Sequence, residues 1–298
     1  MPPPLHSFTT QSQLADLIAR ARAEDLGDPP RDLTSELLVP ADEQGEAVLR
    51  SRAVGRLAGA ALLHTVAKAY DPAITLDVTL DDGDKLVPGA VIARVAGPLR
   101  SLLAMERVAL NLLTHLSGVA TLTARYVEAV GGSKARICDT RKTHLGLRGL
   151  EKYAVVCGGG VSHRIGLYDA VLVKDNHLAR IRFPELAEFT GDVVRRARSV
   201  TPPPAFVEIE VDSLEQLKAV LPAGPDLVLL DNMKLDQLRS AVSIRDRIAP
   251  AVELEASGGV NLETVTAIAR TGVDRIAVGA ITHSAPALDI GMDMSTAS

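Results

Sequence analysis

The hydrophobic pattern of the first 130 residues predicts a mixed unit of helices and strands. Apolar residues at Leu14, Leu17 and Ile18 recur at helical spacing, which indicates an amphipathic first helix. Strands are expected at 47–50, 54–57, 74–80 and 91–95, and further helices at 59–70 and 101–130. We expect the last of these helices to break near Ser117 and Gly118. This front part is therefore predicted to be a small α+β domain.

The remainder of the chain has a different rhythm, in which short apolar segments alternate with helical stretches. The apolar segments are 135–138, 170–173, 206–211, 227–230, 252–256 and 275–278. Each gap is long enough for a helix and two loops, so the segments predict a parallel sheet. Polar or glycine residues occur at every strand end, whereas an open doubly wound sheet gathers them at one crevice. The pattern favours a barrel, and an open sheet remains the alternative.

Composition excludes several classes of partner and location. The net charge is -5, only 3% of residues are aromatic and Trp is absent, which argues against nucleic acid. No apolar stretch approaches the ~20 residues of a membrane span, and the N-terminal residues do not resemble a secretory signal. The two cysteines, Cys138 and Cys157, cannot form a disulfide framework, so we expect a reducing cytoplasm and no membrane association.

A local cationic cluster on this acidic chain predicts a small anionic substrate. Its members lie between residues 138 and 177: Arg141, Lys142, His163, Arg164 and Lys174. Asp139-Thr140 and Lys174-Asp175 each directly follow an apolar segment, as polar residues at strand ends do. Three consecutive glycines, 158–160, precede His163 and Arg164. Guanidinium and ammonium groups gathered at strand ends suit carboxylates or phosphates.

Glycine turns after the last two strands predict a phosphate site. Ser257, Gly258 and Gly259 follow one strand and precede a helix expected to begin near Asn261, and Gly279 follows the next strand. Exposed backbone N–H groups and a helix N-terminus would together favour a bound phosphate.

Two carboxylates, Glu210 and Asp231, end neighbouring strands and predict a Mg²⁺ site. They would repel a phosphate-rich ligand unless a cation lay between, and Mg²⁺ binds through one or two carboxylates plus substrate oxygens. Glu208 shares a face with Glu210 because side chains alternate along a strand. It either meets the metal itself or forms an interior ion pair with a lysine.

Taken together, these residues resemble quinolinate phosphoribosyltransferase, a type II phosphoribosyltransferase family, over nearly the whole chain. The matching segments are Glu24-Asp25, Asp32-Leu33-Thr34-Ser35, Glu106-Arg107, Ser117-Gly118-Val119-Ala120-Thr121, Asp139-Thr140-Arg141-Lys142-Thr143, Glu151-Lys152-Tyr153, Gly158-Gly159-Gly160, His163-Arg164, Lys174-Asp175-Asn176-His177, Glu208-Ile209-Glu210, Leu230-Asp231-Asn232-Met233 and Glu255-Ala256-Ser257-Gly258-Gly259. The resemblance implies transfer of phosphoribosyl from phosphoribosyl pyrophosphate to quinolinate with decarboxylation, giving nicotinate mononucleotide, pyrophosphate and CO₂.

The resemblance also implies a role for each candidate residue. The quinolinate carboxylates would be held by Arg107, Arg141, His163, Arg164 and Lys174, with Thr140 beside them. Lys142 would contact the pyrophosphate, Glu210 and Asp231 would act on Mg²⁺ and the ribose, and Ser257, Gly258, Gly259 and Gly279 would bind the 5′-phosphate. The residues implied as catalytic are Lys142, Lys174, Glu210 and Asp231.

The implied fold class is α/β, with an N-terminal α/β sandwich and an incomplete TIM-like barrel. We expect residues 1–116, with 286–298 returning to them, in the sandwich and 117–285 in the barrel. The resemblance implies a homodimer with shared active sites, in which Arg107 enters from the partner subunit, and it allows hexamers as a further assembly. Two departures from the family pattern stand out: His144-Leu145-Gly146 lacks the usual proline, and Arg31 replaces a common glycine.

Alternative functions remain open at this point. A sister enzyme acting on nicotinate or another aromatic acid would need fewer cations. A related paralogue is disfavoured by Lys174-Asp175-Asn176-His177. A non-catalytic phosphate-binding protein would be expected to lack Glu210, Asp231 or Lys174, and all three are present.

Overall fold

The computed structural model describes residues 2–295 and divides into two compact units. Within the described residues, unit 1 contains 2–124, His144–Gly159 and 284–295, and unit 2 contains Arg125–Thr143 and Gly160–His283. This division differs from the expected domains, because 117–124, 144–159 and 284–285 are predicted to lie in the barrel and instead cluster with unit 1. Residues 1 and 296–298 of the expected N-terminal domain lie outside the described part.

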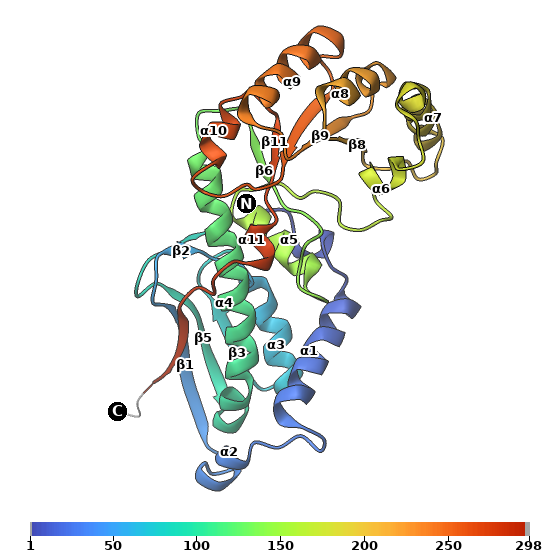
Figure 1. Ribbon diagram of the computed structural model, residues 1–298. Helices are drawn as coiled ribbons and strands as arrows, with labels where there is room; N and C mark the ends of the chain where they lie inside the picture. The colour runs from blue at the N-terminus through green and yellow to red at the C-terminus, as the bar shows by residue number, and fades with distance from the viewer. Residues whose placement is uncertain (1, 296–298) are drawn as a thin grey trace. The chain divides into compact units, whose positions relative to one another are not determined.

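Unit 1 is built on a four-stranded antiparallel sheet of order β12-β1-β5-β3 (Figure 1). Its strands are β1 (Gln44–Ser51), β3 (Thr75–Val78), β5 (Val91–Pro98) and β12 (Ile290–Met294), with a small pair, β2 (Gly55–Arg56) and β4 (Lys85–Leu86), beside it. Ala47 pairs with Val95 on one side and Met294 on the other. The last strand of the chain therefore completes the sheet that the first strand begins.

Helices complete unit 1, and its buried core is supplied by helices and strands together. The helices are η1 (Leu5–Ser7), α1 (Gln11–Leu26), α2 (Leu33–Leu38), η2 (Ala60–Leu62), α3 (Leu63–Tyr70), α4 (Leu99–Ala129, to residue 124 in this unit) and α5 (Arg148–Cys157). Thr10 caps α1 by accepting a hydrogen bond from the Gln13 backbone N–H at 3.2 Å. The expected strand at 54–57 is shorter than predicted, and the helix expected at 59–70 divides into η2 and α3.

The expected break in α4 is wrong, since the helix continues through Ser117 and Gly118. The Ser117 hydroxyl bonds both backbone groups of Ala58, accepting from its N–H at 3.1 Å and donating to its carbonyl at 3.2 Å. A Cβ at Gly118 would lie 2.1 Å from the Pro286 carbonyl oxygen. These small residues therefore permit close packing inside unit 1 and do not mark a turn.

Unit 2 contains six parallel strands in the order β6-β11-β10-β9-β8-β7. They are β6 (Arg136–Cys138), β7 (Val171–Val173), β8 (Val207–Val211), β9 (Leu227–Asp231), β10 (Glu253–Ser257) and β11 (Arg275–Ala277). The first strand pairs with the last, as in a closed barrel, and β6 and β7 end the order. Cys138 forms an isolated bridge with Val161 on the free side of β6. The sheet is thus an incomplete barrel, and the predicted α/β class is confirmed.

Helices follow the strands of unit 2 in the expected βα alternation. They are α6 (Asp175–Leu178), η3 (Phe183–Glu185), α7 (Leu186–Arg198), α8 (Leu214–Val220), η4 (Leu221–Ala223), α9 (Leu235–Ile248), α10 (Val265–Ala269) and α11 (Ala280–His283) (Figure 1). The helix expected near Asn261 begins only at Val265 and is short. Among the described residues, no helix is long and apolar enough to cross a membrane.

Candidate active site

The carboxyl ends of the parallel strands carry most of the predicted site residues. Thr140, Arg141 and Lys142 follow β6, Lys174 follows β7, Glu210 is on β8 and Asp231 ends β9. Ser257 ends β10, where Gly258 and Gly259 follow it, and Gly279 follows β11. Parallel strands bring these ends to one edge of the sheet, so unit 2 gathers residues that lie far apart in the sequence. Arg107 lies elsewhere, on α4 of unit 1, with an exposed side chain.

Two arginines form the cationic part of this edge. Arg164 is only 6% exposed, and burial together with the positive charge of Arg141 lowers the pKa of its guanidinium. The buried Nε of Arg141 has no hydrogen-bond partner among the described residues. Neighbouring guanidinium groups repel each other, and an unpaired buried donor is costly. A dianionic ligand would relieve both effects.

Lys174 and Glu210 are paired at the ends of β7 and β8. The Lys174 Nζ lies 3.1 Å from the Glu210 carboxylate, whose side chain is 12% exposed, whereas the lysine is 46% exposed. This places an exposed cation beside a largely buried carboxylate at the sheet edge. The pairing shows that Glu210 faces the cationic cluster.

The loops after β9 and β10 are held against one another at the predicted phosphate site. The Asn232 N–H donates to the Ser257 carbonyl at 2.9 Å, and the Asn232 side chain donates to Asp231 at 2.7 Å. Gly258 has a φ of +98°, and a Cβ there would lie 2.1 Å from the Asn232 side-chain oxygen. Glycine is therefore required at 258 for both backbone conformation and space.

Lys142 and Gly279 meet at the other end of the sheet, where β6 pairs with β11. A Cβ at Gly279 would lie 3.3 Å from Lys142 Cδ, and the Thr282 hydroxyl donates to the Lys142 carbonyl at 2.7 Å. The predicted pyrophosphate and phosphate residues are thus adjacent here. The helix α10 begins only at Val265, so the turn at Gly258 and Gly259 does not lead directly into a helix N-terminus as predicted.

A buried ionic network lies inside the barrel, and sequence reasoning identified only part of it. His163 Nε2 is 2.9 Å from Glu208 and 3.4 Å from Glu255, and Arg275 Nε is 2.9 Å from Glu255. The lysine partner considered for Glu208 is wrong, because its partner is His163. Glu255 could have been found from strand alternation, because it precedes Ser257 by two positions on β10 and so shares its face.

The contacts of His163 engage both ring nitrogens. Burial opposes its protonation, but hydrogen bonds to Glu208 and Glu255 outweigh this and raise the pKa of His163 to about 9. The Arg164 backbone N–H donates to Nδ1 at 2.8 Å, a bond that only the neutral ring accepts. Burial, and after it the neighbouring carboxylate of Glu255, raises the pKa of Glu208. The hydrogen bond from Arg164 therefore defines a neutral ring that donates from Nε2 to Glu208.

Neither cysteine offers a nucleophile. Burial raises the pKa of the Cys138 thiol, helped by the nearby charge of Glu255, and burial raises that of Cys157 to about 12. A thiol that stays protonated at neutral pH is unreactive.

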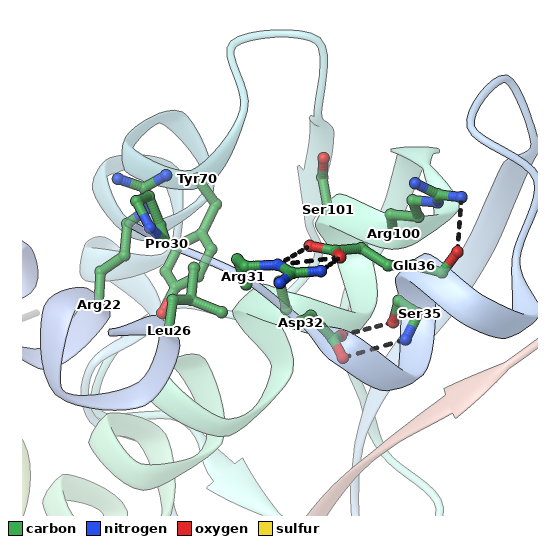
Figure 2. Close-up of a pocket in the computed structure, with 11 residues that line it drawn as sticks. Arg22, Leu26, Pro30, Arg31, Asp32, Ser35, Glu36, Tyr70, Arg100 and Ser101 are labelled. Atoms are coloured by element: carbon green, nitrogen blue, oxygen red, sulfur yellow. Dashed lines mark hydrogen bonds and ion pairs between the residues drawn. The ribbon is translucent and has the colours of Figure 1, made fainter. Parts of the chain in front are cut away.

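A separate hollow of about 260 Å³ lies in unit 1 (Figure 2). It is lined by Arg22, Leu26, Pro30, Arg31, Asp32, Ser35, Glu36, Tyr70, Arg100, Ser101 and Ala104. Figure 2 shows Arg31 paired with Glu36, and Asp32 accepting from the Ser35 backbone N–H, at 3.0 Å, and from its hydroxyl. Asp32 is the N-cap of α2. The family-like segment Asp32-Leu33-Thr34-Ser35 therefore has a structural role here. The predicted site residues lie elsewhere.

Comparisons with known proteins agree with the fold. Sequence profiles of the quinolinate phosphoribosyl transferase N-terminal and C-terminal domains match residues 32–117 and 119–293. The chain belongs to the quinolinate phosphoribosyltransferase family. The resemblance inferred from the sequence is therefore confirmed.

Individual members of this phosphoribosyltransferase family are similar over nearly their full length. The chain is 45% identical to a carboxylating nicotinate-nucleotide pyrophosphorylase of Mycobacterium leprae, over 94% of this chain and 96% of that protein. It is 39% identical to a probable enzyme of the same name from Bacillus subtilis, over 95% and 94%. A solved nicotinate-nucleotide pyrophosphorylase from Francisella tularensis superposes with a TM-score of 0.87 at 34% identity, covering 96% of this chain and 98% of that one.

Proposed function

We propose that this chain transfers phosphoribosyl from phosphoribosyl pyrophosphate to quinolinate with loss of CO₂, yielding nicotinate mononucleotide for NAD biosynthesis. Family membership and the names of its relatives support the reaction class. The observation that carries the choice of substrate is the adjacent pair Arg141 and Arg164, buried or half-buried. A monocarboxylate such as nicotinate would compensate this charge less fully.

The quinolinate end of the site is assigned to the cationic cluster. Arg141 and Arg164 would bind the two carboxylates in the bidentate manner that suits guanidinium groups, with Thr140 beside them. Lys174, held near Glu210, would complete the clamp. His163 has both ring nitrogens engaged in the protein, so we assign it mainly to positioning Arg164, whose N–H it accepts.

The phosphoribosyl end is assigned to the glycine turns. Ser257, Gly258, Gly259 and Gly279 would bind the 5′-phosphate through backbone N–H groups and the serine hydroxyl. Lys142, adjacent to Gly279, would contact the pyrophosphate. Positive charge here would stabilise the leaving group as its bond to the ribose breaks.

Glu210 and Asp231 fit a Mg²⁺ site of the open type. They are half-buried carboxylates at the ends of neighbouring strands, and Mg²⁺ prefers oxygen ligands with the remainder supplied by water and substrate phosphates. When bound, Mg²⁺ would neutralise charge on the pyrophosphate. The two carboxylates would also stabilise positive charge that develops on the ribose.

The chemistry requires little proton transfer by the protein. The pyridine nitrogen attacks the ribose carbon while pyrophosphate leaves. The ring nitrogen is then cationic and stabilises the carbanion formed at the adjacent carbon when CO₂ departs, and that carbon then takes up a proton from solvent. The residues therefore act by orientation and electrostatics, which suits a site of fixed cations without a reactive thiol.

We further propose a homodimer in which Arg107 enters the site of the other subunit, with hexamers as a higher assembly. Arg107 lies exposed on α4, as a residue that reaches a second copy must. Two free, buried cysteines are compatible with a reducing cytoplasmic location.

The decisive experiment is an assay with phosphoribosyl pyrophosphate and Mg²⁺ that compares quinolinate with nicotinate and measures nicotinate mononucleotide and CO₂. We expect product from quinolinate with one CO₂ each. Product from nicotinate alone would show that the chain is instead the related enzyme that acts on nicotinate. No product from either substrate would favour a non-catalytic role.

Two variants test the residue assignments. Arg141→Ala should lower kcat/KM for quinolinate by at least ~100-fold at unchanged stability, since it removes a charged contact worth roughly 3 kcal/mol. Arg239→Ala, an exposed position on α9, is the control. Glu210→Gln should raise the Mg²⁺ concentration for half-maximal rate, and an unchanged titration would remove Glu210 from the metal site.

A further inference from the structure

Three side chains of unit 1 converge outside the site described above. His115 lies on α4, His144 precedes α5 and Glu151 lies on α5. His115 Nε2 is 2.8 Å and His144 Nδ1 is 2.6 Å from the same oxygen of Glu151, Oε1. The potential ligand atoms of all three residues lie within 4.8 Å of one another. Two imidazoles and one carboxylate therefore point at a common centre.

The electrostatics of this centre differ from those of the barrel interior. The Glu151 side chain is fully buried, and among the described residues its ion-pair partners are the two histidines. Glu255 is also buried, but the fixed charge of Arg275 compensates it. Glu151 Oε2 also accepts a hydrogen bond from the His144 backbone N–H at 3.2 Å. Neither this bond nor a neutral imidazole carries a permanent positive charge, which a bound cation would supply.

The centre is open on one side. The His144 side chain is 51% exposed and that of His115 is 24% exposed, so an ion can enter and keep a solvent ligand. A tetrahedral site with ligand bonds of ~2.1 Å separates its ligand atoms by about 3.4 Å. The present spacings of 2.8 and 2.6 Å need to widen by less than an ångström. His144 lies in a turn segment with Gly146 at a φ of +80°, not in a helix, so it can make that adjustment.

We propose that His115, His144 and Glu151 form a binding site for a transition-metal dication such as Zn²⁺, with solvent as the fourth ligand. Imidazole nitrogen favours Zn²⁺, Co²⁺ or Ni²⁺ over Mg²⁺, so this site is chemically distinct from the carboxylate pair Glu210 and Asp231. The bound ion links α4 and α5 to the segment that directly follows Thr143. It thereby restrains the chain immediately after Thr140–Thr143.

The test uses isosteric variants that keep the hydrogen bonds but remove the metal ligands. In His115→Gln the amide nitrogen takes the place of Nε2, and in His144→Asn it takes the place of Nδ1, so each still donates to Glu151. His64→Gln, an exposed histidine on α3 of the same unit, is the matched control. Chelator-treated, tag-free protein is titrated with Zn²⁺ in excess Mg²⁺ by calorimetry, and Co²⁺ spectra report the ligand type.

We expect the wild-type chain and His64→Gln to bind one Zn²⁺, and both isosteric variants to bind Zn²⁺ more than ~100-fold more weakly. A loss of this size exceeds the effect of removing a residue that only hydrogen-bonds to a metal ligand. Zn²⁺ should raise the melting temperature of the wild-type chain and not that of the variants. Absence of Zn²⁺ binding by the wild-type chain, or unchanged binding in both variants, would overturn the proposal. Melting of the metal-free variants checks their folding independently.

Discussion

Replacing Arg275 by methionine removes the only fixed cation paired with Glu255 among the described residues. Arg275 is 8% exposed and Glu255 is fully buried, and the two are register partners on β11 and β10, joined at 2.9 Å. At a charge separation of roughly 4 Å and an effective dielectric constant of ~20, the attraction is about 4 kcal/mol. Methionine fills similar space without charge, so the carboxylate of Glu255 is left buried and uncompensated.

We expect Arg275→Met to lower the free energy of unfolding by about 3–5 kcal/mol, the range for breaking a buried pair. For a domain of this size the melting temperature would fall by roughly 10 °C. The control is Arg136→Met, because Arg136 is the register partner of Arg275 on β6 and pairs with Glu253 at the surface, where the two side chains are 47% and 40% exposed. An exposed pair contributes no more than ~1 kcal/mol.

The assay is thermal and urea unfolding of both variants, with Glu255→Gln and the double variant completing a cycle. The double variant should be less destabilised than the sum of its parts by about 1–3 kcal/mol, since removing both charges leaves no buried ion. Equal effects of Arg275→Met and Arg136→Met, or strict additivity in the cycle, would refute the electrostatic explanation.

Three further predictions concern packing and pH. Gly118→Ala should destabilise unit 1 by at least ~2 kcal/mol in urea unfolding, because its Cβ would meet the Pro286 carbonyl at 2.1 Å, and wild-type stability would show that this contact yields. Asp274→Asn should remove acid-sensitive stability. Burial raises the pKa of Asp274, but hydrogen bonds and ion pairs outweigh burial, so the pKa in the folded protein lies below the unfolded value near 3.8. The stability that Asp274 contributes is therefore present above pH 3.8 and is lost as the pH falls through the folded pKa. Comparison of the two proteins' unfolding between pH 2 and 6 tests this, and parallel curves would contradict it. Gly258→Ala should weaken phosphoribosyl pyrophosphate binding at least ~10-fold by displacing Asn232, with isothermal titration as the measurement and unchanged affinity as the contrary result.

The sequence predicted the barrel strands well because each is a short apolar run ended by a polar residue. The segment 227–230 is the clearest case, since β9 is buried along nearly its whole length. The prediction from sequence was wrong at α4, where Ser117 and Gly118 resemble the residues that end a helix. Small residues that permit close packing and small residues that end a helix are the same residue types, and only the neighbours Ala58 and Pro286 distinguish them.

In the candidate site, too, the sequence predicted which residues lie at strand ends but not which of them contact one another. Strand ends identified Glu210, Asp231 and the glycine turns, because parallel strands place their carboxyl ends on one edge. Which charges pair with which was not predictable: Glu208 was considered for a lysine and meets His163. Arg275 was not selected, since a charged residue at a strand start is usually exposed.

By itself, the sequence determined the alternation of strands and helices, the family and the candidate chemistry, because periodicity and motif spacing are local properties of the chain. Only the tertiary structure decided the pairing of β6 with β11, the place of β12 beside β1, the buried network around Glu255 and the meeting of His115, His144 and Glu151. These contacts join residues from separate elements. They are set by how buried charges are compensated and how backbones approach, which no local pattern encodes.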